Sequence, residues 1–226
     1  MANRSDKRHD YLSLRDRRAI ENATSFAPQV GLPLTCAITV HWANADGPCT
    51  GDWRTKFEYT VLLSKRWMRR NSATWAATAV HEQGSSKEAP HTHLAVHVSP
   101  ALAAKFEAYL SRLLDGRFER VVWVRPIKPP AGAPGWARYQ TKAIHSRYFD
   151  KVSPPVRMAD RNKVQGPIFG RRIYISRSIG EAAQTRFLAN LAKTPALTGN
   201  PDIDQRIMAR WEWRQGQPQQ RRHDAA

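Results

Sequence analysis

Cysteine is scarce in this sequence: only Cys36 and Cys49 occur among 226 residues, and they form no C-x-x-C pair. This scarcity argues against a disulfide framework and a structural zinc site, and it favours a reducing compartment. Long apolar runs are also missing, since nothing approaches the roughly eighteen consecutive apolar residues of a membrane span. The first residues lack the apolar stretch of a secretory signal. We therefore expect a cytoplasmic protein with no membrane partner.

Acidic residues are few relative to basic ones: 19 Asp and Glu accompany 36 Lys and Arg, which gives a formal net charge of +17. Such an excess is typical of proteins that bind polyanions, and nucleic acid is the leading partner. Eight Trp, six Tyr and seven Phe accompany the charge. This mixture suits stacking on unpaired bases, although many of these rings will belong to the core.

Composition changes along the chain and predicts three segments. Residues 1–32 are polar and basic, and we expect a basic arm outside the core, with a short helix around 11–23. Residues 33–193 carry regular apolar patterns and are predicted to form the folded domain. Residues 194–226 are dominated by Pro, Gly, Gln and Arg, which predicts a basic, partly disordered tail.

Apolar periodicity within the central segment predicts alternating strands and helices. The predicted strands cover 34–42, 73–82, 90–98, 119–127 and 171–177. The predicted helices cover 55–70, 100–115, about 136–145 and 178–191. The second and third strands flank a polar loop and are expected to pair as a hairpin. This order predicts an α+β sandwich, with a largely antiparallel sheet of about five strands and helices packed against it.

The predicted strand PHTHLAVHV, residues 90–98, carries three histidines. Because alternate side chains of a strand share a face, His91, His93 and His97 point one way and the apolar residues between them point into the core. Two imidazoles two residues apart can bind one metal ion, and an added carboxylate shifts the preference toward Mg or Mn. The pattern alone is weak, because an isolated H-x-H also occurs in ordinary strands.

A third ligand is expected from the preceding strand, which ends in His81-Glu82. Glu82 is the candidate, because a hard oxygen beside two nitrogens leaves positions open for phosphate oxygens and water. The parity of the strand does not choose between His81 and Glu82. A metallo-hydrolase of the metallo-β-lactamase kind would place an Asp-His pair just after the two histidines. Leu94-Ala95-Val96 stands there instead, so that class is excluded.

The helix predicted at 136–145 contains Tyr139 and Lys142, three residues apart. Residues at i and i+3 are neighbours on a helix surface and can contact a common target. A second Y-x-x-K at Tyr148 and Lys151 lies nine residues further on, which is the opposite side of a continuous helix. We therefore expect one catalytic tyrosine, Tyr139, and interpret Tyr148 as a core or rim residue.

The order of these motifs resembles that of the HUH endonuclease superfamily, specifically its rolling-circle replication initiator proteins. A strand that begins with Leu34-Thr35, a later H-x-H strand and a helix with Tyr and Lys follow one another over residues 34–145. The resemblance implies the HUH/RRM-like sandwich as the fold. The middle residue of the histidine motif, usually bulky and apolar in the family, is Thr92 here.

The resemblance also implies roles for individual residues. His91 and His93 look like the metal-binding pair, and Glu82 matches the acidic ligand on the preceding strand. Tyr139 looks like the nucleophile, and Lys142 resembles the lysine that helps to hold the metal site or stabilises phosphate charge.

The activity implied is metal-dependent, sequence-specific nicking and joining of single-stranded DNA through a 5′-phosphotyrosine intermediate. Such a protein uses Mg or Mn, binds single-stranded DNA at a replication origin and initiates rolling-circle replication of a plasmid or phage. No G-x-x-x-x-G-K-[ST] loop occurs, so unwinding would come from a partner such as a host helicase. Trp42 and Trp136, beside the first strand and the tyrosine helix, are candidates for base stacking, with core packing the alternative for each.

Two other interpretations stay open. The chain could be another member of the superfamily, although relaxases usually place the tyrosine before the histidines and the transposases are commonly shorter. It could also be a non-catalytic basic nucleic-acid-binding domain whose sheet face happens to carry histidines, although no RNP-like K-G-F-G-F-V run occurs. The position of Tyr139 relative to His91 and His93 in the folded chain discriminates between these interpretations.

Overall fold

A computed structural model gives the fold of most of the chain. It describes residues 8–83, 90–114, 121–128, 132–150, 152, 166–191 and 205. The chain divides into two compact units, Met1–Ala182 and Ala183–Ala226. The tail predicted at 194–226 lies outside the described residues, apart from position 205.

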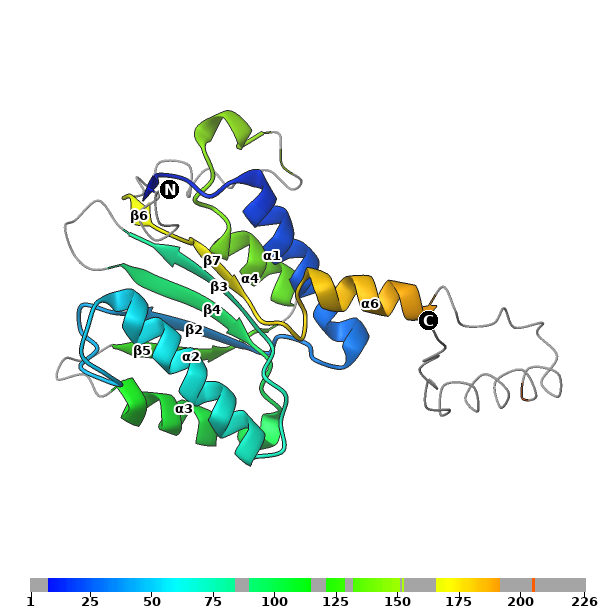
Figure 1. Cartoon of the computed structure of the whole chain (residues 1–226), viewed down its shortest axis with the longest axis horizontal. Helices are drawn as coiled ribbons and strands as arrows, with labels where there is room; N and C mark the ends of the chain where they lie inside the picture. Colours follow the sequence, from blue (N-terminus) through cyan, green and yellow to red (C-terminus); the bar gives the residue numbers. More distant parts are fainter. Residues whose placement is uncertain are drawn as a thin grey trace, which may run out of the picture. The chain divides into compact units, whose positions relative to one another are not determined.

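A five-stranded antiparallel sheet occupies the centre of the first unit, in the order β5-β2-β4-β3-β7 (Figure 1). Its strands are β2 (Cys36–His41), β3 (Ala77–Glu82), β4 (His91–Val96), β5 (Val122–Pro126) and β7 (Ile173–Ile175). A second, two-stranded sheet pairs β1 (Arg8–His9) with β6 (Ile168–Phe169). The predicted α+β class is confirmed. All five predicted strands of the sheet are present, each shortened at one or both ends.

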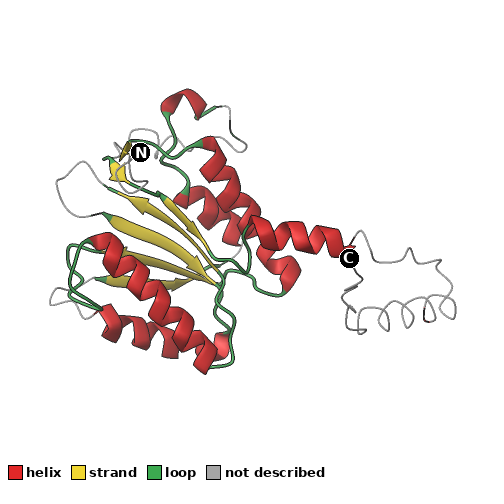
Figure 2. Ribbon diagram, in the orientation of Figure 1, coloured by secondary structure: helices red, strands yellow, loops and turns green. Residues whose placement is uncertain are grey.

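Helices cover both faces of the five-stranded sheet (Figure 2). One face carries α2 (Trp53–Arg70) and α3 (Pro100–Leu114), and the other carries α1 (Leu14–Phe26) and α4 (Gly132–Gln140). The remaining helical elements are η2 (Ala27–Val30), η3 (Ser146–Tyr148) and α6 (Glu181–Leu191). The sheet is therefore the middle layer of three.

The pleat of the central strands sorts the side chains as the sequence predicts. Ile38 of β2 pairs with Leu94 of β4, and both lie in the main core with Phe57 of α2 and Phe106 of α3. Burial of each such side chain contributes about 1.5–3 kcal/mol. His93, one residue before Leu94, belongs to the opposite face, because successive side chains of a strand alternate. This alternation places the histidines on the α4 side of the sheet.

The described part of the predicted amino-terminal arm packs into the first unit. Ser13 caps α1, since its hydroxyl oxygen accepts a hydrogen bond from the backbone N–H of Asp16 at 3.0 Å. Leu12 and Ile20 are buried against Val80 in a second, smaller core. The composition of this segment did not indicate a role in the core. The few apolar residues of α1 lie among charged ones, so its mean hydropathy is polar although one face of the helix is apolar.

Ile20→Ala tests this packing. We expect the substitution to lower the free energy of unfolding by about 2–5 kcal/mol, because it empties a fully buried position. Denaturant unfolding followed by circular dichroism measures the change. Asn22→Ala, at an exposed position of the same helix, is the control and should stay within about 0.5 kcal/mol of the parent. Equal stability of both variants would return this segment to the role of a dispensable arm.

Within the described ranges, no helix combines the length and apolar character needed to cross a membrane. The two cysteines are free thiols, Cys36 buried and Cys49 half-buried. Cys36 lies in the main core, where burial raises the pKa of its thiol. It therefore acts there as a small apolar side chain.

Candidate active site

The pairing of β3 with β4 decides which residue of His81-Glu82 lies beside the two histidines. Glu82 pairs with His91, and His81 pairs with Thr92. Directly opposed residues of neighbouring strands lie on the same face of a sheet. Glu82 therefore shares the face of His91 and His93, whereas His81 lies on the other face. The choice that sequence parity left open falls on Glu82.

His81 and Thr92 form a buried polar contact on the α2 side of the sheet. His81 Nδ1 lies 2.8 Å from Thr92 Oγ1, and the His81 ring packs 4.5 Å from the ring of Phe57. Burial lowers the pKa of His81 to about 3, which keeps the imidazole neutral at pH 7. The Trp42 indole N–H also donates to Thr92 Oγ1, at 2.7 Å. A hydroxyl in the middle of the histidine motif therefore has two partners here.

Trp42 is consequently a core residue and not a stacking platform. Its side chain is 2% exposed and contacts the ring of Phe57. The alternative of core packing, which the sequence left open for this tryptophan, is the one that the fold adopts.

Glu82, His91 and His93 form a group that could hold a metal ion. Their ligand atoms all lie within 4.8 Å of one another. The Nε2 atoms of His91 and His93 are each 3.4 Å from Glu82 Oε2. Two ligands about 2.1 Å from one ion lie about 3.0 Å apart in octahedral geometry and about 3.4 Å apart in tetrahedral geometry, so these two spacings suit a shared ion.

One ring nitrogen of His93, Nε2, faces the carboxylate of Glu82 at 3.4 Å. This nitrogen is buried and accepts or donates no hydrogen bond among the described residues, while Nδ1 lies 2.9 Å from Thr39 Oγ1. An unsatisfied buried polar atom costs about 1–3 kcal/mol, which a bound ion would remove. Burial lowers the pKa of His93 to about 4, so the ring is neutral at pH 7 and in the form that binds metal. The Thr39 contact orients the ring as outer-shell partners do.

Glu82 is a buried carboxylate held by a buried lysine. Lys142 Nζ donates to both oxygens of Glu82, at 2.9 and 2.7 Å. Burial by itself would raise the pKa of Glu82, but the adjacent imidazoles of His91 and His93 and the charge of Lys142 more than offset it and lower this pKa well below its usual value. The carboxylate is therefore ionised at neutral pH and available as a hard ligand.

Tyr139 lies beside this group, on α4. Its ring centroid is 5.1 Å from that of His93, and Lys142 Nζ is 4.0 Å from the centre of the tyrosine ring. Two neighbours fix the helix to β4. The Trp136 indole N–H donates to the Leu94 carbonyl at 3.1 Å, and the Gln140 amide donates to the His93 carbonyl at 2.7 Å. The fold thus brings Tyr139 and Lys142 together with the predicted metal ligands.

Helix α4 ends at Gln140, five residues before the predicted end. Beyond it the chain turns so that the Leu12 N–H donates to the Ala143 carbonyl at 2.8 Å, and Ile144 bridges Leu12 in parallel. Lys142 is therefore past the helix, in a turn where its backbone N–H donates to the Tyr139 carbonyl at 3.4 Å. Tyr148 lies in η3, half-buried at the edge of the second core, the rim position interpreted from the sequence.

No protein-family model matches the chain, and no curated protein matches it. Function is therefore inferred from the site itself, because a fold of this architecture does not imply one.

Sequence reasoning did not assign a site role to two residues near the group of Glu82, His91 and His93. The His41 ring stacks on that of His91 at 5.3 Å, and the Trp123 ring meets His41 edge-on at 4.9 Å. Trp123 is 37% exposed, so a row of rings leads from the metal group across β2 to β5. The alternation of residues 34–42 places His41 on the polar face of its strand. The continuous apolar run around Trp123 has no such alternation, so the sequence does not assign Trp123 to a face.

The third predicted histidine, His97, serves a structural role. Its Nδ1 lies 2.7 Å from the Pro33 carbonyl oxygen.

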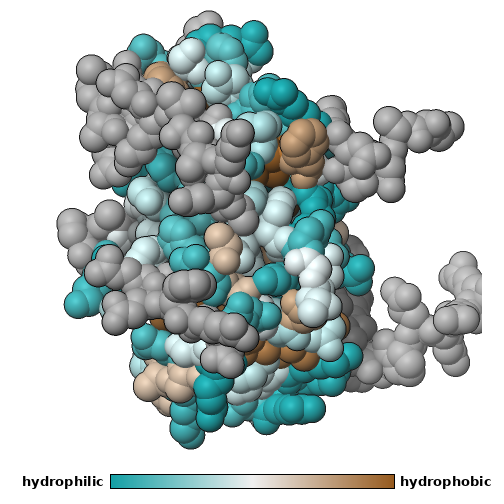
Figure 3. Space-filling view, turned by 90° about the vertical axis from the view of Figure 1, so that its left-hand side faces the viewer, coloured by the Kyte–Doolittle hydropathy of each residue, from teal (hydrophilic) through white to brown (hydrophobic). Residues whose placement is uncertain are grey.

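Figure 3 views the molecule from the end of the sheet where β3 ends and β4 begins. The described residues visible there are mostly hydrophilic, with small, separate apolar patches. A polar surface at this end is compatible with a charged substrate.

Proposed function

We propose that this protein is a metal-dependent endonuclease and strand transferase of the HUH type, which nicks and joins single-stranded DNA. One observation carries the proposal: Glu82 of β3, His91 and His93 of β4, and Tyr139 of α4 meet at one place, although nothing local in the sequence requires it. A nucleophile beside a metal group is the arrangement that covalent phosphoryl transfer needs.

Tyr139 is the nucleophile of the proposed reaction. Its phenol oxygen attacks the phosphorus of a DNA phosphodiester and loses its proton to solvent. The bond from phosphorus to the 3′ oxygen breaks, and that oxygen takes up a proton as it leaves. The products are a 5′-phosphotyrosine and a free 3′-hydroxyl. The linkage conserves the energy of the broken ester, so a 3′-hydroxyl can later reverse the step without ATP.

Glu82, His91 and His93 hold the divalent ion in this proposal, and their mixed oxygen and nitrogen donors suit Mg or Mn. When bound, the ion supplies Lewis-acid stabilisation of charge on the phosphoryl group. Lys142 adds a fixed positive charge 4.0 Å from the ring centre of Tyr139.

A labelled single-stranded oligonucleotide library with Mn²⁺ tests the proposal. We expect a covalent protein–DNA adduct on a denaturing gel, absent with EDTA, and mass spectrometry should locate the nucleotide on the peptide that contains Tyr139. If the protein binds DNA but forms no adduct with Mn²⁺ or with Mg²⁺, the result would instead support a non-catalytic nucleic-acid-binding domain.

The biological role in this proposal is the initiation of rolling-circle replication of a plasmid or phage, at an origin recognised as single-stranded DNA. The net charge of +17 supports a polyanionic partner. The sequence contains no nucleotide-binding P-loop, so a helicase supplied by the host is the partner expected to unwind the duplex.

In this proposal the unpaired strand runs along the row of rings formed by His91, His41 and Trp123, and Trp123→Ala tests this path. Loss of one stacking platform should weaken single-stranded DNA binding by about 1–3 kcal/mol, or about 5- to 150-fold. Fluorescence anisotropy in EDTA measures affinity without cleavage. Tyr59→Ala, which removes an exposed ring of α2, is the control and should leave affinity unchanged. Equal affinities of the two variants would place the strand elsewhere.

A further inference from the structure

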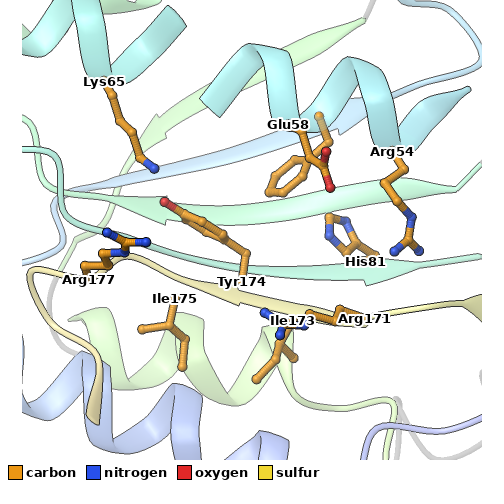
Figure 4. A pocket seen from close by; sticks show the side chains of 10 residues that line it. Arg54, Glu58, Lys65, His81, Arg171, Ile173, Tyr174, Ile175 and Arg177 are labelled. Carbon is orange, nitrogen blue, oxygen red and sulfur yellow. The ribbon is translucent and has the colours of Figure 1, made fainter. Parts of the chain in front are cut away.

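A hollow of about 390 Å³ lies between α2 and the edge strand β7 (Figure 4). Four cationic side chains line it: Arg54 and Lys65 from α2, and Arg171 and Arg177 from the segments on either side of β7. The ring of Tyr174 forms part of the wall between them. We name this feature the α2–β7 groove. It lies on the α2 side of the sheet, whereas Tyr139 lies on the α4 side.

Positive charges outnumber negative ones among the described residues that line this groove. Glu58 is its one acidic lining residue. Within the described ranges, neither Lys65, Arg171 nor Arg177 forms an ion pair with a carboxylate. Like charges gathered around a hollow repel one another and destabilise the fold, unless an anionic ligand offsets them.

Arg54 is held in place at one end of the groove. Its guanidinium donates to the Phe169 carbonyl and lies 5.0 Å from the Trp53 ring centre. Gly170, with φ +78°, leaves the space that Arg54 occupies, because a Cβ there would collide with the guanidinium. At the other end Lys65 Nζ lies 5.7 Å from the Tyr174 ring centre. The two cations therefore have defined positions.

The length of the groove selects the kind of anion. Arg54 and Lys65 are eleven residues apart on α2, which is about 16 Å along a helix at 1.5 Å per residue. Their side chains also lie at opposite ends of the hollow (Figure 4), so one phosphate group does not contact both. A chain of regularly spaced phosphates can, and the half-buried Tyr174 ring lies between the two ends.

We infer that the α2–β7 groove binds the phosphate backbone of a nucleic-acid strand, at a site separate from the metal group and on the other face of the sheet. The protein then contacts nucleic acid at two places. The groove needs neither the metal nor Tyr139, so this inference stands or fails independently of the nicking activity proposed above.

The double variant Arg171→Gln/Arg177→Gln tests the inference, because both side chains are exposed and their loss should spare the fold. Arg66→Gln/Arg69→Gln is the matched control: it removes the same charge from exposed positions of α2 that do not line the groove. Affinity is measured by fluorescence anisotropy in EDTA, over a series of salt concentrations. The probes are a 20-nucleotide single strand, a duplex of the same length and a mononucleotide. Thermal unfolding of each variant verifies that it is folded.

We expect the groove variant to lose about tenfold in affinity, and the slope of log affinity against log salt to fall by about 1.4 for a single strand, or 1.8 for a duplex. The control should change by about twofold or less. The form of DNA that shows the larger loss identifies whether the groove holds the unpaired or the paired part. Equal losses in both double variants, or competition by the mononucleotide as strong as that by the oligonucleotide, would overturn the inference.

Discussion

Tyr139→Phe is expected to abolish the covalent protein–DNA adduct and to leave DNA affinity within about twofold of the parent. The substitution removes the phenol oxygen and keeps the ring, so the stacking on Trp136 at 5.1 Å and the contact with His93 persist. Loss of a covalent nucleophile costs at least about three orders of magnitude in rate, because no neighbouring group replaces it. A denaturing gel with labelled oligonucleotide and Mn²⁺ measures the adduct, and anisotropy measures binding.

Tyr148→Phe is the matched control for this experiment. Tyr148 also belongs to a Y-x-x-K motif, but it lies in η3 at the edge of the second core. Its hydroxyl should be dispensable for adduct formation. An adduct that survives in Tyr139→Phe and disappears in Tyr148→Phe would transfer the nucleophile to the second tyrosine and remove the argument from the geometry around His93.

The double variant His91→Ala/His93→Ala should lose Mn²⁺ binding and metal-dependent nicking together. Two of the three ligand atoms disappear. The remaining ligand, Glu82, keeps its contact with Lys142. Loss of a single outer-shell partner already costs 10- to 100-fold in metal affinity, so the loss of two direct ligands should exceed about 100-fold. Isothermal titration calorimetry with Mn²⁺ measures affinity, and the gel assay measures nicking.

A thermal-shift experiment gives the same answer without DNA. A ligand at one hundred times its dissociation constant adds about 2.7 kcal/mol to the stability of the protein that binds it. Mn²⁺ should therefore raise the unfolding temperature of the parent and leave that of the double variant unchanged. His97→Ala is the control, since this histidine directly follows β4 and contacts the Pro33 carbonyl. Unchanged Mn²⁺ binding by the double variant would point to other ligands.

The elements that the sequence predicts well are those whose signal is local. Cys36, Ile38 and Val40 alternate with polar or small residues, and each position assigns its own face. Such a period survives folding because the pleat of a strand is fixed by its backbone. The α+β class followed from these periods and from the order of strands and helices.

Long-range contacts explain what the sequence did not reveal. The ligand choice between His81 and Glu82 needed the register of β3 on β4, which no single strand contains. The segment that follows α4 pairs with Leu12, more than a hundred residues earlier in the chain. Trp123 lies in an apolar run without alternation, so the sequence did not indicate which face of the sheet it occupies. The folded chain places it beside His41.

The anchoring of α4 has a mechanical consequence. Trp136 and Gln140 donate to the carbonyls of Leu94 and His93, which are consecutive peptide units of β4. Tyr139 lies between these two residues in the sequence, so the hydrogen bonds hold its ring against the strand that carries His93. Because this attachment is direct, the distance between the two rings does not depend on the length of the chain that joins β4 to α4.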